Sequence, residues 1–237
     1  MDIARAVELE KTYLEHRMKG EEPFHMIDAV RECGFETLEE YFAEKQNYLF
    51  GKLQFNYVEQ PMPGGVAEIF KMVSANNPGA LFVDWEETYV VCADAGLEEF
   101  NREYCAENNI PFFPLYTDGG TIVGAKGDFS LGICCPQFVI NDHRYILNGV
   151  KNILQRHTEK EITVRGNDIC ADGNKICGSA CYRAGKVFMV IMHFSFSDLS
   201  DLITKICRTT KTGKPVAYID FMTRNTFKAG VAEWLRV

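Results

Sequence analysis

Three polar residues with catalytic potential lie close together in the last third of the chain: Asn167, Asp168 and Lys175. The run Asp172–Asn174 between them is typical of a hairpin turn, because Gly and Asn tolerate positive φ. Such a turn would place Lys175 at the start of a strand, across from residues 169–170. The spacing therefore predicts that the three polar side chains converge.

A lysine held on a strand presents a fixed point charge to an anion. The small residues Gly178, Ser179 and Ala180 follow it and would leave room for a ligand beside the ammonium group. The simpler interpretation is that Asn167 and Asp168 cap a turn and that Lys175 is a solvated strand end, since turn chemistry is commoner than catalysis.

The whole segment resembles lipoate-protein ligases. In that family Asn-Asp precedes a hydrophobic strand, a short turn follows, and the next strand opens with Lys-hydrophobic-Ser/Cys-Gly-Ser/Asn-Ala. This chain carries Arg165-Gly-Asn-Asp168 and Lys175-Ile-Cys-Gly-Ser-Ala180 in the same order. An upstream helix at 66–71 and two strands at 81–85 and 89–91 also fit. The resemblance covers about residues 52–237 and leaves 1–51 as an added helical module.

The resemblance implies a biotin/lipoate ligase-like catalytic domain and the transfer of a lipoyl or octanoyl group to a lysine of a lipoyl-domain or similar carrier protein. Lys175 would stabilise the charge that develops on an acyl-adenylate. Asn167 and Asp168 would orient ribose, phosphate or a magnesium ion, with Asp168 as the magnesium ligand. ATP and lipoate or octanoate would then be the small-molecule substrates.

The glycine loop of the family, which holds the adenylate phosphate and acyl group, is altered in this chain. Gly119 and Gly120 remain, whereas Leu115 replaces an arginine and Asp118 adds a negative charge, which disfavours a phosphate. The pair of glycines is equally typical of a simple turn. A further family motif, His-His-Gly-Thr, is replaced by the apolar run 189–192, and the adjacent His193 is more typical of a core or edge residue than of a base.

These departures leave two alternatives open: an ATP-independent cysteine acyltransferase, as in the octanoyltransferases of the same superfamily, and a ligand-binding accessory protein without catalysis. Cys177 and Cys181 lie nearest to Lys175 in the sequence, and a neighbouring cation would favour their thiolates. Each is more typical of a small core residue than of a nucleophile. The nine cysteines lack the paired spacing of a structural zinc site, and we expect reduced thiols.

Helices and strands are expected to alternate irregularly around these residues. Helices are expected through the first fifty residues, the third with a capping box at Thr37–Glu40, and Pro61–Gly65 excludes regular helix or central strand. Further helices are expected at 66–75, 97–108, 143–156 and 198–207, the last capped by Ser197. Strands are expected at 81–85, 89–93, 112–116, 121–123, 129–134, 161–164, 169–171, 175–182 and 187–195. This order predicts a mixed α/β (α+β) fold.

Composition excludes several classes of partner. The net charge is −8 and no dense run of Lys or Arg occurs, so a nucleic-acid backbone would be repelled. No apolar run reaches the roughly 18 residues of a membrane span, and the N-terminus lacks the charge order of a signal peptide. We therefore expect a cytoplasmic protein that binds neither nucleic acid nor membrane.

Overall fold

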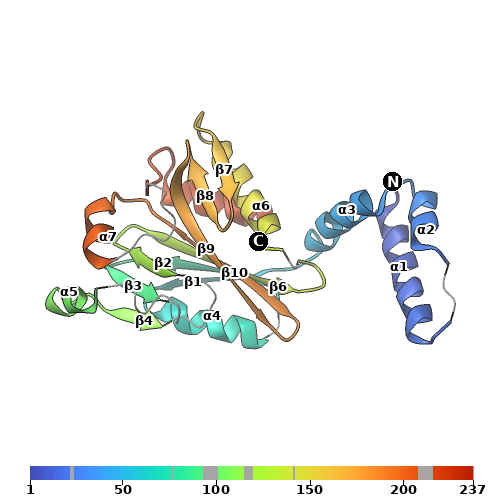
Figure 1. Ribbon diagram of the computed structural model, residues 1–237, viewed down its shortest axis with the longest axis horizontal. Helices are drawn as coiled ribbons and strands as arrows, with labels where there is room; N and C mark the ends of the chain where they lie inside the picture. The colour runs from blue at the N-terminus through green and yellow to red at the C-terminus, as the bar shows by residue number, and fades with distance from the viewer. Residues whose placement is uncertain are drawn as a thin grey trace. The chain divides into compact units, whose positions relative to one another are not determined.

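The computed structural model describes residues 1–21, 24–75, 77–92, 101–114, 120–140, 142–207 and 216–236. The chain forms two compact units, Met1–Leu53 and Gln54–Val237, beside the predicted division after residue 51. The first unit contains α1 (Ile3–Met18), α2 (Met26–Glu32) and α3 (Leu38–Phe50) (Figure 1). Their apolar faces enclose a small core, in which the buried Tyr41 donates a hydrogen bond to Glu10 (2.8 Å).

The predicted capping box at the start of α3 is present with one difference. The Thr37 hydroxyl accepts the amide proton of Glu40 (3.1 Å), as expected. The Glu40 carboxylate reaches back to the amide of Glu36 (2.8 Å), one residue before the predicted partner. Two backbone amides at the start of the helix therefore donate to local side chains.

The second unit is built on a seven-stranded sheet with the order β1-β2-β6-β10-β9-β8-β7, in which β1 runs parallel to β2 and all other neighbours are antiparallel. A small sheet has the order β4-β3-β5. The mixed α/β class is confirmed. The strand bounds are β1 Asn56–Pro61, β2 Gly79–Asp84, β3 Tyr89–Cys92, β4 Phe112–Pro114, β5 Thr121–Gly124, β6 Phe129–Pro136, β7 Ile162–Arg165, β8 Asp168–Ala171, β9 Asn174–Ala184 and β10 Val187–Phe194.

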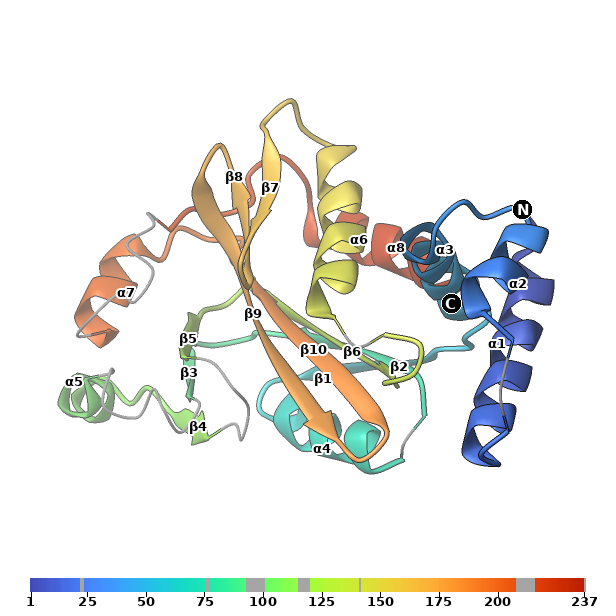
Figure 2. The ribbon, with the colours of Figure 1, turned by 45° about the vertical axis from the view of Figure 1, so that its right-hand side comes forward.

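Helices cover the two faces of the large sheet (Figures 1 and 2). On one face α4 (Gly64–Ala75) packs Ile69 and Met72 against apolar side chains of β2, β6 and β10. On the other face lie α6 (His143–Gln155) and α8 (Arg224–Leu235), and Phe227 of α8 contacts Phe129 and Phe194 at 5.7 and 4.6 Å between ring centroids. Since successive strand residues point to opposite faces, each strand divides its side chains between these two layers.

The two remaining helices accompany the small sheet. α5 (Arg102–Glu107) contributes Cys105 and α7 (Ser200–Ile206) contributes Ile206 to a cluster that includes Val90 and Val123 of the small sheet. Residues 97–100 of the predicted helix at 97–108, residue 93 of the predicted strand at 89–93 and residues 115–116 of the predicted strand at 112–116 lie outside the described part of the chain.

Two local predictions are wrong. Gly64 and Gly65 begin α4, although the run Pro61–Gly65 was expected to exclude regular helix. A Cβ at Gly65 would lie 2.5 Å from Val83 Cγ1, so glycine allows the helix to approach β2 closely. The helix predicted at 198–207 begins later, at Ser200, and Ser197 does not cap it: the Asp198 carboxylate accepts the Ser200 amide proton instead (3.0 Å).

Candidate active site on the large sheet

The predicted hairpin joins β8 to β9 and places Lys175 as expected. Asp172 and Gly173 both have positive φ, 48° and 82°, which gives a two-residue turn whose twist suits a hairpin. Lys175 pairs with Cys170, and its carbonyl accepts the amide proton of Ala217 (2.8 Å). The backbone of the lysine is therefore held from both sides.

The Lys175 ammonium forms an ion pair with Asp168, with Nζ and Oδ1 2.8 Å apart. The Asp168 side chain is 9% exposed and that of Lys175 is 26% exposed. The pair is thus largely enclosed, and the lysine keeps the more accessible position. This confirms that Asp168 and Lys175 come together.

A register shift in β9 explains how Lys175 and Gly178 come to share a face of the sheet. In a regular strand, residues three apart point to opposite faces. Here the pairing with β8 shifts between Ile169 and Cys170, so that one residue is absorbed as a bulge. A Cβ at Gly178 would lie 3.0 Å from Lys175 Nζ. The glycine therefore provides the space into which the ammonium group folds.

The other predicted binding residues are distributed differently. Asn167 is exposed in the turn before β8, and its carbonyl accepts hydrogen bonds from the Ser179 amide (2.9 Å) and hydroxyl (2.8 Å). Ala180 is buried on the same face as Gly178, whereas strand alternation turns Ser179 to the opposite face. Gly120 is exposed before β5. Gly119 lies outside the described residues.

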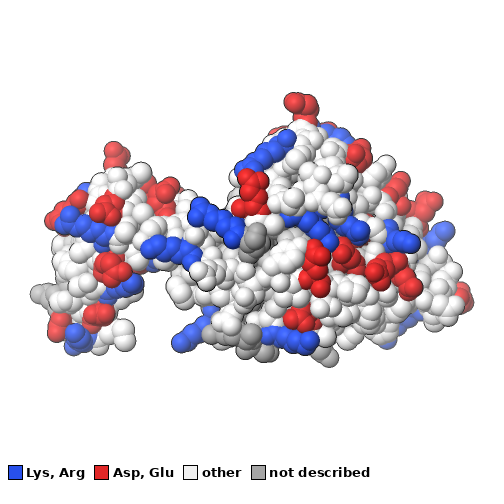
Figure 3. Space-filling view, turned by 180° about the vertical axis from the view of Figure 1, so that it is seen from behind, with Lys and Arg blue, Asp and Glu red and all other residues white. Residues whose placement is uncertain are grey.

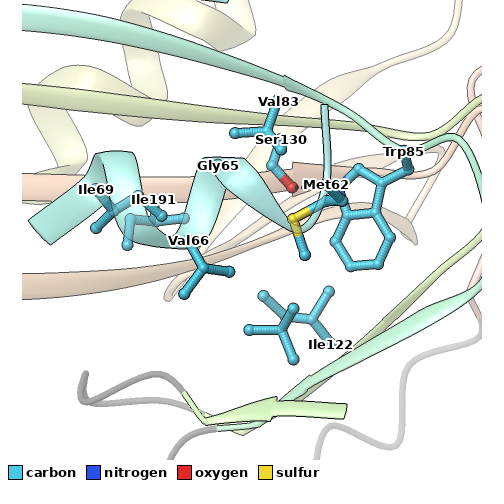
Figure 4. A pocket seen from close by; sticks show the side chains of 10 residues that line it. Met62, Gly65, Val66, Ile69, Val83, Trp85, Ile122, Ser130 and Ile191 are labelled. Atoms are coloured by element: carbon cyan, nitrogen blue, oxygen red, sulfur yellow. Dashed lines mark hydrogen bonds between the residues drawn. The ribbon is translucent and has the colours of Figure 1, made fainter. Parts of the chain in front are cut away.

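An apolar pocket lies between α4, the large sheet and the small sheet (Figure 4). The pocket is small, with a cavity volume of about 20 Å³, and it is partly open to solvent. Sequence reasoning did not predict it, because its walls come from six separate segments. Its lining residues are Met62, Gly65, Val66, Ile69, Val83, Trp85, Val91, Ile122, Ser130 and Ile191.

The strand register places this pocket and the Lys175–Asp168 pair on one face of the large sheet. A single row of directly paired residues crosses β2, β6, β10, β9 and β8 in order: Val83, Ser130, His193, Gly178 and Asp168. The row begins in the pocket wall and ends at the ion pair. Three strand spacings separate Ser130 from Asp168, or roughly 14 Å.

His193, which the sequence favoured as a core or edge residue, lies in the middle of this row. It is 6% exposed, its Nδ1 lies 3.0 Å from Ser130 Oγ, and its Nε2 lies 3.6 Å from Asp128 Oδ2. Trp85 Nε1 donates to the same Ser130 oxygen (2.9 Å). This buried polar group was missed, because nothing local in the sequence links residues 85, 130 and 193.

Cys177 and Cys181 lie on the opposite face from Lys175. They pair with Phe194 and Val190 of β10, whose side chains face the α6 and α8 layer. Burial raises the pKa of the Cys177 thiol well above its usual value, although the nearby Lys175 charge opposes this shift. None of the nine cysteines forms a disulfide, and the described residues contain no group of three His, Cys, Asp or Glu side chains arranged around a metal.

The comparison with protein-family models decides the relationship of the chain to known proteins. Residues 67–221 match the model of the lipoyl protein ligase A/B catalytic domain. The chain belongs to this family. The match covers more than half of the 237 residues and includes every predicted binding residue. The predicted family is thereby confirmed, and no curated protein matches the chain.

Solved structures share the fold of this family member at low sequence identity. A bipartite lipoate protein ligase from Thermoplasma acidophilum, studied with its E2 lipoyl domain, has a TM-score of 0.64 and 16% identity over 78% of this chain and 84% of its own. LipL1 from P. falciparum, in complex with lipoate, has a TM-score of 0.66 and 13% identity over 76% and 61%. Lipoate-protein ligase A bound with ATP has a TM-score of 0.62 and 18% identity over 78% and 86%.

The surface of this lipoyl ligase family member carries both signs of charge. Lys and Arg side chains are interspersed with Asp and Glu over the face presented in Figure 3, a pattern that does not favour a nucleic-acid backbone on that face. Among the described residues, none of the helices combines the length and apolar character that a bilayer crossing requires.

Proposed function

We propose that this protein is a lipoate-protein ligase-like enzyme that transfers a lipoyl or other medium-chain acyl group to a lysine of a carrier protein. The observation that carries the proposal is the shared face of the large sheet. A small pocket with an apolar lining lies at one end of a row of paired residues, and the Lys175–Asp168 ion pair lies at the other end. An acyl chain and the anionic group attached to it need an apolar and a cationic environment on the same face.

In this proposal Lys175 is the electrostatic centre of the site. The acceptor amine attacks the acyl carbonyl carbon, and the leaving group departs with the negative charge that develops on its oxygen. A fixed ammonium group stabilises that charge more than it stabilises the neutral acyl carbonyl. The Asp168 carboxylate, 2.8 Å from Nζ, orients the lysine until a ligand oxygen competes for it.

ATP is the activating substrate in this proposal, supported by the family and by the ATP-bound neighbour. Asn167, exposed beside Asp168, and Gly120 are the described residues that we assign to the nucleotide, as the family pattern implies. Asp168 offers a single carboxylate whose Oδ1 already contacts Lys175. It suits a magnesium ion only where nucleotide phosphates supply the remaining ligands, as is usual for this metal.

The acceptor in this proposal is the lysine of a lipoyl domain, the class of partner named with the T. acidophilum ligase. Incubation of the protein with lipoate or octanoate, ATP, magnesium and an apo lipoyl domain, followed by intact mass spectrometry of the domain, tests it. We expect one acyl group on the domain, dependent on ATP. Lack of any acylation with either acid would contradict the proposal.

The matched variants are Lys175→Ala and Lys186→Ala. Lys175 faces the site, whereas Lys186 is exposed in the turn between β9 and β10. We expect Lys175→Ala to lower turnover by about 100-fold or more, the size of effect seen when one charge-stabilising donor is removed. Lys186→Ala should retain wild-type turnover, and thermal melts of both variants separate loss of activity from loss of folding.

A ligand-binding accessory protein is the second candidate, favoured by Leu115 in the position of a family arginine. It predicts that lipoate or octanoate binds while no acyl group reaches a carrier under any condition. A cysteine acyltransferase predicts instead an ATP-independent adduct on Cys177 or Cys181. Isothermal titration with the acids and ATP, singly and together, combined with the mass measurement separates the three functions.

A further inference from the structure

A serine, a histidine and an aspartate follow one another where the large sheet forms the wall of the apolar pocket. Ser130 lines the pocket, and Figure 4 shows its hydroxyl oxygen among apolar side chains, close to Met62 and Trp85. Its Oγ lies 3.0 Å from His193 Nδ1, and the other ring nitrogen of His193 lies 3.6 Å from Asp128 Oδ2. The side chains come from β6, from β10 and from the turn before β6.

The surroundings of the His193 ring favour one direction for the serine proton. Trp85 Nε1 is only a donor and lies 2.9 Å from Ser130 Oγ, so the oxygen accepts that bond. The direction of the Ser130–His193 bond depends on the tautomer of the imidazole, and the Asp128 carboxylate, 3.6 Å from Nε2, favours a proton on that nitrogen. With the ring proton on Nε2, Nδ1 is unprotonated and accepts the Ser130 hydroxyl proton. Nε2 is buried without a hydrogen-bond partner in the described structure, and the Asp128 carboxylate is the acceptor that it faces.

Asp128 and His193 are held rigidly. Asp128 is fully buried, and its two carboxylate oxygens accept the amide protons of Phe196 (2.9 Å) and Ala125 (3.0 Å). A Cβ at Gly124 would lie 2.6 Å from His193 Cε1 and from Trp85 Cε3, so the two rings fill the space that this glycine leaves. A fixed carboxylate and a confined imidazole are what an oriented general base requires.

We propose that Ser130 is an acyl-accepting nucleophile, with His193 as its general base and Asp128 as the group that orients the imidazole, and that its substrate is an aliphatic acyl thioester. This inference rests on the proposed function in one respect, the assignment of the pocket to the acyl chain. It requires no ATP. Nucleophile, base and orienting group are recognised here by geometry, as in serine hydrolases of unrelated folds.

The reaction has two balanced steps. In the first, Ser130 Oγ bonds to the acyl carbonyl carbon as its proton passes to His193 Nδ1; the C–S bond breaks, and the leaving thiolate takes that proton. In the second, an acceptor amine bonds to the carbonyl carbon of the acyl-serine, the C–O bond breaks, and the amine proton returns to Ser130 Oγ through His193. The net change converts a thioester and an amine into an amide and a thiol.

The test uses the full chain, S-octanoyl-N-acetylcysteamine as the acyl donor, and no ATP. Intact mass spectrometry and peptide mapping should find one octanoyl group on Ser130. The adduct should survive neutral hydroxylamine, because an oxygen ester reacts far more slowly than a thioester. We expect Ser130→Ala to abolish the adduct and His193→Gln to slow its formation by about 100-fold or more.

Two further variants make the result decisive. Ser130→Cys keeps the size of the side chain and should give an adduct at position 130 that neutral hydroxylamine removes. Ser195→Ala removes an equally buried serine, 8% exposed, that does not line the pocket, and should leave acylation unchanged. If Ser130→Ala folds poorly, Ser130→Cys still reports whether position 130 accepts the acyl group.

The outcomes separate this inference from the proposed function. A wild-type protein that gains no acyl group from the thioester, or gains it on a cysteine or lysine, overturns the role of Ser130 even if ATP-dependent transfer from free octanoate is observed. An octanoyl group on Ser130 without any ATP-dependent transfer supports the serine route and contradicts the ligase.

Discussion

The two faces of β9 lie in different surroundings. Lys175, Gly178 and Ala180 face the pocket layer, where the ammonium group of the lysine lies over the glycine. Cys177 and Cys181 point into the layer covered by α6 and α8. Residues adjacent in sequence, predicted as one group, are thus divided by strand alternation. The difference teaches that chemistry and stability are assigned to separate faces of the same sheet.

Truncation of a large side chain on the helix-covered face gives the largest expected effect. Phe194 is fully buried and contacts Phe129 and Phe227. We expect Phe194→Ala to lower the free energy of unfolding by about 3–5 kcal/mol, from lost burial and the cavity left behind. Ile191→Val, in the pocket wall, should cost only about 0.5–1.5 kcal/mol. Urea denaturation measures both, and a loss below about 2 kcal/mol for Phe194→Ala would contradict its role in the core.

The adjacent cysteines of β6, Cys134 and Cys135, point to opposite faces of the sheet, and the pH dependence of stability tests whether both are buried as thiols. Burial raises the pKa of Cys134, on the pocket face, to about 11 and that of Cys135, on the helix face, to about 12. An unfolded thiol ionises near pH 8.5–9, so each buried thiol contributes stability below that pH and loses it as the pH rises toward its folded pKa. We expect each to contribute a loss of about 1–2 kcal/mol by pH 10.

Alanine variants separate the contribution of these thiols to the unfolding free energy from that of the tyrosines, which also ionise at alkaline pH. Cys135→Ala should flatten the fall in unfolding free energy between pH 8 and 10, measured by urea denaturation at each pH. Cys134→Ala should flatten it similarly, and the wild-type loss should continue to higher pH for Cys135 than for Cys134. Identical pH profiles for the wild type and both variants would contradict the buried, protonated state of these thiols.

Local sequence signals predicted the elements whose cause is local. The hairpin at Asp172–Gly173 follows from residues that accept positive φ, and Thr37 caps α3 as expected. The strand β1 and the helix α8 were missed, although α8 has a readable signal: the Thr223 hydroxyl accepts the Thr226 amide proton at its start (3.1 Å). The capping residue of α8 is therefore a local signal, although no helix was predicted there.

The pocket and the serine–histidine pair could not be predicted in this way. Ser130 and His193 are 63 positions apart and meet only because β6 and β10 pair in one register. A shift of that register by one residue would turn one of the two side chains to the opposite face. Likewise, Lys175 and Gly178 share a face only because of the bulge between them. Register and bulges depend on packing across the whole sheet, which local spacing does not encode.

The smallest expected effect concerns the two cysteines nearest to Lys175. Because both point away from the pocket layer, Cys181→Ala and Cys177→Ala should change the rate of acyl transfer by less than about twofold, within the range of surface and small-core substitutions. Cys177→Ala should still lower stability slightly, since its thiol is buried against the helix-covered layer. The measurement is turnover per folded molecule, with the folded fraction taken from the melt of each variant. A large loss of turnover in either variant at unchanged stability would restore the cysteine acyltransferase.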